Sequence, residues 1–273
     1  MHSDPLRIAI MAKAPVPGLA KTRLAPALGA AGAAALAERL LRHAVAQAAG
    51  AAPGRVTLWA APDATHPVFA DLARQHGLAL AVQPVTPDLG ARMAAVFARQ
   101  AAGGHAAGAA GQAARDAGSN AGSNAGSDAC SDACSDAGSD AGNNAGNDAG
   151  SHAGSHAAND RGPLLLMGSD IPALCSQTLR HAGAALQDGH PVVFVPALDG
   201  GYALVGLRAD AEARHPGLHA ALFRQMVWST AQVMAQTRQR LAVLGVVAAE
   251  LPAVPDIDEP DDLAHLPAGW LPP

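Results

Sequence analysis

The most informative segment of the chain reads Met11-Ala12-Lys13-Ala14-Pro15-Val16-Pro17-Gly18-Leu19-Ala20-Lys21-Thr22-Arg23-Leu24. It follows Leu6-Arg7-Ile8-Ala9-Ile10, an apolar, β-branched run that is typical of a buried strand. Lys13, Lys21 and Arg23 therefore lie at the carboxyl end of a strand, which is the edge where ligands bind in open α/β sheets. Lysine and arginine make charge-assisted contacts with phosphate. The segment predicts a loop that binds the phosphates of a nucleotide.

The same cationic loop admits two other interpretations. Its charges could simply form a solvated loop face. The segment Gly18-Leu19-Ala20-Lys21-Thr22 also resembles the end of a P-loop. A P-loop needs glycine directly before its lysine so that backbone N–H groups can wrap the phosphates, and this chain has Ala20 there. We therefore exclude a P-loop ATPase and keep Gly18 as the residue that lets the loop turn tightly.

Length and composition bound the possible classes of protein. The chain has 273 residues, enough for one large or two small domains. It contains no run of about eighteen apolar residues, and its first residues lack a basic region before a hydrophobic core. We therefore expect a cytoplasmic protein with no membrane span. Its three cysteines do not form a disulfide framework.

A low-complexity segment interrupts the chain. From Asp116 to Asp160 an Asp, Asn or His recurs at every fourth residue, mostly in Ala-Gly-Ser-Asp or Ala-Gly-Ser-Asn units. Glycine disfavours a helix by about 1 kcal/mol per residue, and no large apolar side chain offsets the ordering entropy. We predict a disordered insertion over residues 104–160. Without its net charge of −6, the whole-chain charge of −5 becomes +1, so the acidic balance says nothing about the substrate.

The remaining parts, residues 1–103 and 161–273, alternate strand and helix patterns and predict one α/β domain with a doubly wound, mostly parallel sheet. Strands are expected at Leu6–Ile10, Arg55–Ala61, Leu78–Gln83, Leu164–Met167, Val192–Val195, Tyr202–Leu207 and Val246–Leu251. Helices are expected at Ala30–Ala49, His66–His76, Gly90–Gln100, Ser176–Gln187 and Thr230–Leu244.

Carboxylates follow two of the predicted strands. Asp170 comes just after a strand that reads as buried on both faces, where it could hold a divalent cation that bridges phosphates. Asp170 could instead cap the next helix. Asp258, in a second acidic cluster, could supply a second carboxylate. Asp261 and Asp262 in that cluster favour a helix N-terminus.

Three further segments carry residues that suit a binding site. Asp199-Gly200-Gly201-Tyr202 is a hairpin signal before a strand. Gly90 and Arg92 open a helix, and Arg92 would suit an anionic or polar ligand group, although a surface arginine is equally common. Trp228 could line an acceptor pocket or merely pack, with Ser229 as the cap of the following helix.

Taken in order, these motifs resemble the bacterial DUF2064 family of glycosyltransferase-A-like (GT-A) proteins, distant relatives of phospholactate guanylyltransferase and the molybdenum cofactor nucleotidyltransferases. The resemblance covers residues 6–266 apart from the insertion. It depends on the segment Ala12–Leu24 and on Leu89-Gly90-x-Arg92-Met93, Gly168-Ser169-Asp170-x-Pro172, Asp199-Gly200-Gly201-Tyr202, Trp228-Ser229-Thr230 and Asp256-Ile257-Asp258-x-Pro260-x-Asp262-Leu263. The chain departs from its relatives in the insertion and at Ala203, where they often carry a second aromatic residue.

The resemblance implies a GT-A/nucleotidyltransferase-type fold that uses a divalent metal, Mg²⁺ or Mn²⁺, and a nucleotide-bound donor. The residues expected at the nucleotide and its phosphates are Ala12, Lys13, Gly18, Lys21, Thr22, Arg23, Gly90 and Arg92. The metal would be held by Asp170 and Asp258, with Asp170 and Asp199 as catalytic carboxylates. The acceptor pocket would include Gly200, Gly201, Tyr202 and Trp228.

Three functions remain open. The first is transfer of a sugar from a nucleotide-sugar to a small-molecule acceptor. The second is nucleotidyl transfer, in which a phosphorylated acceptor attacks an NTP and pyrophosphate leaves. The third is a catalytically silent nucleotide-binding or scaffold protein, which the intact Asp170 and Asp258 argue against. None of them involves a nucleic-acid partner, and the oligomeric state is not predicted.

The insertion supplies the first testable prediction. Joining Gly103 to Arg161 with a short Gly/Ser linker should leave the melting temperature nearly unchanged, because the deleted residues lack apolar side chains that could join a core. Thermal unfolding of the shortened chain checks this. A loss of several degrees, or insoluble protein, would show that the insertion packs on the domain.

Overall fold

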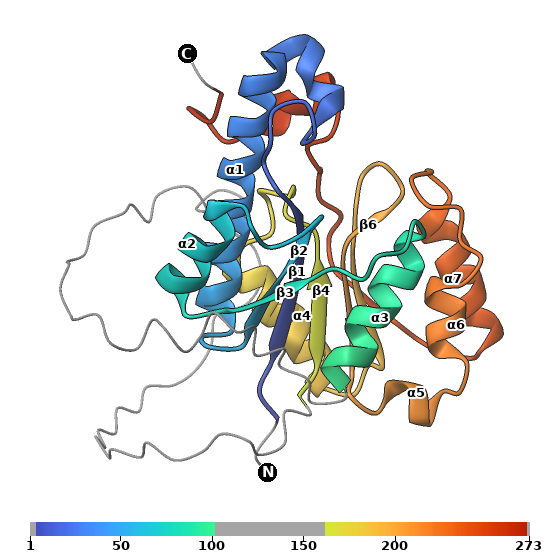
Figure 1. The fold of residues 1–273 in the computed structure, drawn as a ribbon. Helices are drawn as coiled ribbons and strands as arrows, with labels where there is room; N and C mark the ends of the chain where they lie inside the picture. Colours follow the sequence, from blue (N-terminus) through green and yellow to red (C-terminus); the bar gives the residue numbers. More distant parts are fainter. Residues whose placement is uncertain (1–3, 102–161, 272–273) are drawn as a thin grey trace, which may run out of the picture.

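The computed structural model describes residues 4–101 and 162–271. The predicted insertion lies outside the described residues, and the division of the chain around it stays a prediction. The described part contains a seven-stranded sheet in the order β3-β2-β1-β4-β6-β5-β7 (Figure 1). The strands are β1 (Arg7–Lys13), β2 (Val56–Ala61), β3 (Ala79–Val82), β4 (Leu164–Met167), β5 (Val192–Pro196), β6 (Tyr202–Leu207) and β7 (Ala249–Glu250). Among them only β6 runs against its neighbours, which confirms the predicted α/β fold with a mostly parallel sheet.

Helices cover both faces of this sheet (Figure 1). One face carries α1 (Ala25–Ala51), α2 (Pro67–His76) and α4 (Ser176–Gln187). The other carries α3 (Leu89–Ala101), α5 (Ala211–Arg214), α6 (Leu218–Phe223) and α7 (Val233–Val243). Two short 3₁₀ turns, η1 (Thr22–Leu24) and η2 (Pro260–His265), lie in the segments that will form the candidate site.

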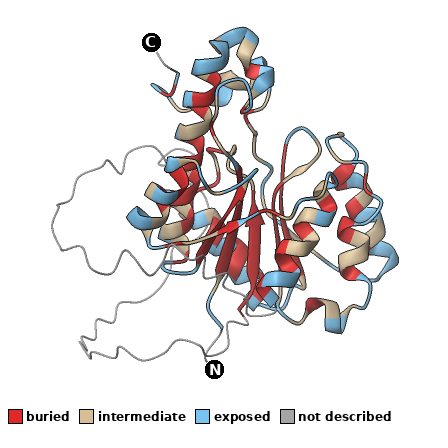
Figure 2. Ribbon diagram, viewed as in Figure 1, coloured by how far each residue is buried: buried red, intermediate tan, exposed pale blue. Residues whose placement is uncertain are grey.

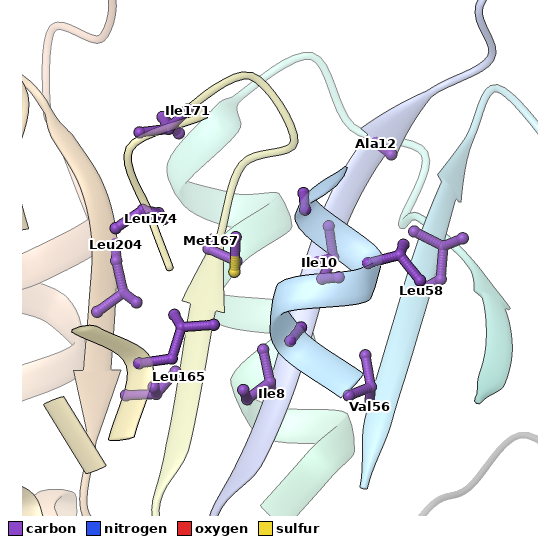
Figure 3. Packing of buried hydrophobic residues seen from close by; sticks show 14 of the residues in the cluster. Ile8, Ile10, Ala12, Val56, Leu58, Leu165, Met167, Ile171, Leu174 and Leu204 are labelled. Atoms are coloured by element: carbon purple, nitrogen blue, oxygen red, sulfur yellow. The ribbon is translucent and has the colours of Figure 1, made fainter. Parts of the chain in front are cut away.

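Strand alternation explains the two layers. On β1, Ile8 and Ile10 pack into the cluster beneath α1, α2 and α4, whereas Ala9 between them packs toward α3 and α6. On β4, Leu165 and Met167 join the first cluster from the neighbouring strand (Figure 3). The central strands are therefore buried on both faces, as their continuous apolar runs predict (Figure 2).

The predicted elements differ from the observed ones mainly near the carboxyl end. The helix expected to start at Thr230 begins at Val233, and the strand expected over Val246–Leu251 shrinks to Ala249–Glu250, an edge strand that pairs only with β5. Helices α5 and α6 were not predicted. They span only 4 and 6 residues, too few for a helical period to show.

By length and composition alone, the helical stretch Thr22–Ala51 could cross a membrane. One such helix is weak evidence, because core helices of α/β domains meet the same criterion. In the structure α1 buries a stripe that includes Leu36, Leu41 and Val45, and it packs against α4 and the sheet. The helix thus contacts the rest of the domain along one stripe, and the cytoplasmic location stays a prediction.

Candidate functional site

The loops that follow β1 and β4 meet at one edge of the sheet. The two strands are parallel neighbours with Ile10 opposite Met167, so both chain segments leave the sheet at its carboxyl edge. A cavity of about 540 Å³ opens there. Its lining includes predicted site residues from segments far apart in the chain: Ala12, Lys13, Lys21, Thr22, Arg23, Arg92, Asp170, Tyr202 and Asp258.

Lys21 lies between two of the predicted carboxylates. Its Nζ donates to Asp170 Oδ2 at 2.9 Å and to Asp258 Oδ1 at 3.4 Å. The lysine side chain is only 12% exposed. Burial by itself lowers the pKa of Lys21, but the two carboxylates outweigh it and hold the pKa above its ordinary value. Lys21 is therefore a fixed ammonium charge in the cavity wall.

The backbone around Lys21 is strained in a way that supports this placement. Lys21 adopts the left-handed conformation (φ 47°, ψ 46°) directly before η1, which costs a non-glycine residue about 1–2 kcal/mol. Such conformations persist where the surroundings fix them, often at functional sites. Arg23 follows and is 60% exposed, with Nη1 2.8 Å from Asp258 Oδ2. Lys21 and Arg23, two of the three cations of the predicted phosphate loop, thus both contact Asp258.

Asp170 does not cap a helix. The helix after it, α4, begins at Ser176 with Cys175 as its N-cap, so the capping alternative is wrong. The Asp170 side chain instead pairs with Lys21, and its backbone oxygen accepts from Ile257 N at 3.1 Å. Asp170 thereby joins the loop after β4 to the acidic segment that precedes η2.

The other residues of the predicted phosphate loop have distinct places. Lys13 is the last residue of β1 and lies exposed on the cavity wall, where Thr22 also lies. Ala12 is buried, and its carbonyl oxygen accepts from Gln83 Nε2 at 3.1 Å. Gly18 turns the loop with φ 79°, a conformation that glycine adopts without strain.

Gly90 and Arg92 open α3 and have different roles. A Cβ at Gly90 would collide with the backbone oxygen of Phe223 and lie 2.8 Å from Cζ2 of Trp228, so glycine here permits close packing. Arg92 lines the cavity with Nη1 3.5 Å from Gln83 Oε1. Among the described residues its buried Nε has no hydrogen-bond partner. Buried donors normally have an acceptor, so Arg92 has capacity for a ligand oxygen.

Gln83 is a site residue that the sequence analysis missed. It directly follows β3 and is 7% exposed. Its Nε2 donates to the carbonyl oxygens of Ala12 and of Trp59, the latter at 2.9 Å. The amide therefore ties together the ends of three strands. A polar residue at the carboxyl end of a predicted strand is the signal that could have identified it.

The predicted acceptor-pocket residues gather around a second cavity of about 460 Å³, which is also lined by both carboxylates that contact Lys21. Tyr202 and Trp228 form an edge-to-face pair with ring centroids 6.1 Å apart. Asp199 lines the same cavity from the β5–β6 turn and accepts from Gly201 N at 2.8 Å. The two rings and this carboxylate thus share one hollow.

The segments that frame this second cavity partly follow the predictions. The expected hairpin is confirmed, because β5 and β6 are antiparallel and Gly200 turns the chain with φ 89°. A Cβ at Gly200 would collide with the backbone of Ala231, so glycine lets the lead-in to α7 pack closely. Ser229 is not the cap of α7: its φ is 59°, and Gln232 holds the N-cap position.

The acidic segment before η2 contains a second residue that the sequence analysis did not single out. Burial, and next the nearby Asp199 carboxylate, raise the pKa of Asp256 to about 6. Asp262 behaves as predicted for a helix N-terminus, since its Oδ2 accepts from Asp258 N at 2.9 Å and from Glu259 N at 2.6 Å. These bonds fix the backbone that carries the Asp258 carboxylate.

The residues present fit a divalent cation that is also bound by a ligand. Within residues 4–101 and 162–271, no group of three or more His, Cys, Asp or Glu side chains is arranged to hold a metal. Asp170 and Asp258 nevertheless share one cation, the Lys21 ammonium, and are 37% and 41% exposed. Two carboxylates are what Mg²⁺ usually takes from a protein when phosphates complete its coordination.

One protein-family model matches part of this chain. Residues 123–230 match DUF2064. The model is described as an uncharacterized protein conserved in bacteria, and the match confirms the resemblance expected from the motifs. It includes Asp170, the Asp199–Tyr202 turn and Trp228. No curated protein matches the chain.

Solved structures were compared with this fold. A protein of Desulfovibrio desulfuricans G20, described as a candidate nucleotide-diphospho-sugar transferase, is similar with a TM-score of 0.61 and 23% identity, covering 96% of this chain and 85% of that one. Two further structures have lower TM-scores. Rv0371c of Mycobacterium tuberculosis H37Rv has a TM-score of 0.42 and 13% identity over 99% of both chains. A CMP:2-keto-3-deoxy-manno-octonic acid synthetase complexed with CTP has a TM-score of 0.43 and 11% identity over 96% of both chains. The first of these similarities shows a shared fold.

The packing at Gly90 gives a test of its role. Gly90→Ala should lower the melting temperature by several degrees, because the new Cβ would meet the rigid backbone oxygen of Phe223 and the ring of Trp228. The exposed neighbour substitution Ala91→Ser, measured in the same thermal unfolding experiment, should have little effect. Unchanged stability of Gly90→Ala would mean that glycine is needed there only for the approach of a ligand.

Proposed function

We propose that this chain is a metal-dependent transferase with a nucleotide-activated donor, which moves a sugar from a nucleotide-sugar to a small acceptor. The observation that carries the proposal is the placement of Lys21 between Asp170 and Asp258 in the wall of the 540 Å³ cavity. The cavity wall therefore carries carboxylates that suit a metal ion next to side-chain cations that suit phosphates. A second cavity with an aromatic wall adjoins them and offers room for an acceptor.

Each part of the site has a role in this reaction. A bound Mg²⁺ or Mn²⁺, held by Asp170 and Asp258, would stabilise negative charge on the diphosphate. Lys21, Arg23 and Lys13 donate to phosphate oxygens and stabilise the charge that develops as the nucleoside diphosphate leaves. These three cations thus act where charge appears during the reaction.

The acceptor side of the proposal depends on the second cavity. Asp199, a carboxylate of the β5–β6 turn that lines this cavity, accepts a proton from an acceptor hydroxyl in this proposal. Burial raises the pKa of Tyr202, so its hydroxyl stays protonated at neutral pH. Together with Trp228 it gives the acceptor an apolar surface and excludes water from the transferring group.

Nucleotidyl transfer is the second candidate function, because the same cations and carboxylates suit an NTP attacked at its α-phosphate. The released product separates the two. Free nucleoside diphosphate indicates glycosyl transfer, whereas pyrophosphate indicates nucleotidyl transfer. A thermal-shift screen of nucleotides and nucleotide-sugars with Mg²⁺ or Mn²⁺ comes first, since a ligand that binds the folded state raises its stability. The absence of any shift would favour the scaffold alternative.

Asp170 provides the sharpest test of the metal. Asp170→Asn should change the melting temperature little, because the carboxylate is more than one third exposed and asparagine can still accept from Lys21. It should abolish the metal-dependent part of nucleotide binding, since a hard divalent cation requires the charge. Nucleotide titrations with and without Mg²⁺ measure this.

Asp210→Asn is the matched control for this variant. Asp210 is also a part-exposed carboxylate paired with arginines, but it adjoins α5, away from the candidate site. Its replacement should leave the metal dependence intact. Normal metal-dependent binding by Asp170→Asn would remove Asp170 from the metal site and shift the assignment to Asp258 or Asp199.

Lys21 is the residue whose loss should weaken nucleotide binding most. Lys21→Ala should reduce affinity by about 1.5–3 kcal/mol, the range for hydrogen bonds to charged groups. Arg23→Ala should cost less, because Arg23 is 60% exposed and solvent screens it. Titration calorimetry compares the two. Affinity of Lys21→Ala within twofold of the parent would leave the phosphate assignment without support.

A further inference from the structure

A third apolar cluster lies apart from both faces of the sheet. It contains Leu24, Ala33, Leu36, Leu40, Ile257 and Trp270. Its members come from η1, from residues 33–40 of α1 and from residues 257–270, which we call the C-terminal clasp. The clasp includes η2 and lies beside the upper part of α1 (Figure 1). Neither layer of the sheet core depends on this cluster.

Trp270 anchors the clasp on α1. It is 8% exposed, and the guanidinium carbon of Arg39 lies 5.0 Å from the centre of its ring. Arg39 Nη1 also donates to the carbonyl oxygens of Gly269 and Trp270, at 2.9 and 3.1 Å. The ring of His43 meets the indole edge-on at 5.1 Å. The end of the clasp is therefore held by apolar, cation–π and hydrogen-bond contacts.

Two residues of the cluster are direct sequence neighbours of candidate-site residues. Leu24, fully buried in the cluster, follows Arg23, and Ile257, also fully buried, precedes Asp258. Ile257 N donates to the backbone oxygen of Asp170 at 3.1 Å. The position of this small core thus sets the distance between the phosphate-loop cations and the two carboxylates.

The exposed ion pair between Arg23 and Asp258 is too weak to hold the clasp by itself. Arg23 and Asp258 are 60% and 41% exposed, and ion pairs with such exposure contribute little to stability. Burial of an indole ring is among the largest apolar contributions that one side chain makes. Burial of Trp270 is therefore a larger contribution to the docking of the clasp than the ion pair of Arg23 with Asp258.

We propose that Trp270 and Arg39 are positioning residues, which dock the clasp on α1 and so hold Asp258 against Lys21 and Arg23. The consequence for ligand binding rests on the proposed function, whereas the coupling between clasp and phosphate loop does not. Loss of the anchor should loosen two segments at once, residues 20–28 and residues 256–266, although Trp270 belongs to neither.

The test compares Trp270→Ala with Trp270→Phe in the full chain by amide hydrogen exchange. In Trp270→Ala, peptides from both segments should exchange at least tenfold faster, while those of β1 and β4 stay protected. Trp270→Phe should restore most of the protection, because a ring still fills the cluster. Leu271→Ala is the neighbouring control, since Leu271 is 45% exposed. Phe69→Leu is the control for lost stability, because Phe69 is a fully buried residue of α2 that packs into the sheet core.

Binding of UDP and GDP with Mg²⁺ is measured on the same variants. Trp270→Ala should weaken binding at least fivefold, and Trp270→Phe should recover it. Faster exchange confined to residues 256–266, or an equal change in Phe69→Leu, would overturn the proposal. If the parent binds neither nucleotide while both segments exchange faster together in Trp270→Ala, the coupling stands and the proposed function loses its support.

Discussion

The site depends on one interaction, the ammonium group of Lys21 held between the carboxylates of Asp170 and Asp258. It joins the loop after β1, the loop after β4 and the acidic segment near the carboxyl end. Without the cation, two carboxylates would face one cavity and repel each other. Lys21 allows both to stay charged close together, and a bound divalent cation would need the same arrangement.

The exposure of the three groups shows why this arrangement can serve binding as well as structure. The lysine is almost buried, whereas the carboxylates are more than one third exposed. A fully buried ion pair would be closed to ligands and would carry a large desolvation cost. Here the carboxylate oxygens remain open to the cavity. The strained backbone at Lys21 is consistent with a side chain that is fixed by its partners rather than by local preference.

The sequence predicts features that depend on local pattern. It does not predict contacts between residues that lie far apart in the chain. Leu164–Met167, Ser176–Gln187 and Tyr202–Leu207 were predicted with their observed bounds, because apolar runs and helical spacing are local. The candidate carboxylate Asp170 followed from its place after a buried strand. The bridge at Lys21 could not be predicted, since it joins residues 149 and 237 positions apart. Gln83 was missed because it was included in the predicted strand Leu78–Gln83, whereas β3 ends at Val82 and leaves Gln83 at the edge of the site.

Strand direction explains why four segments converge on one edge. Strands β1 and β4 are parallel neighbours, so the loops after them leave the sheet together. Strand β6 runs the other way, which places its beginning, not its end, at the same edge. The turn that carries Asp199 follows β5, which is antiparallel to β6 and so runs in the direction of β4. That turn therefore lies at the carboxyl edge as well. Strand β7 is parallel to β5, so the chain leaves β7 at the same edge of the sheet, and the acidic segment follows β7 there. The shared direction of β1, β4 and β5 thus places the Asp199 turn at the edge that carries Asp170, and the reversal of β6 brings Tyr202 to the same edge.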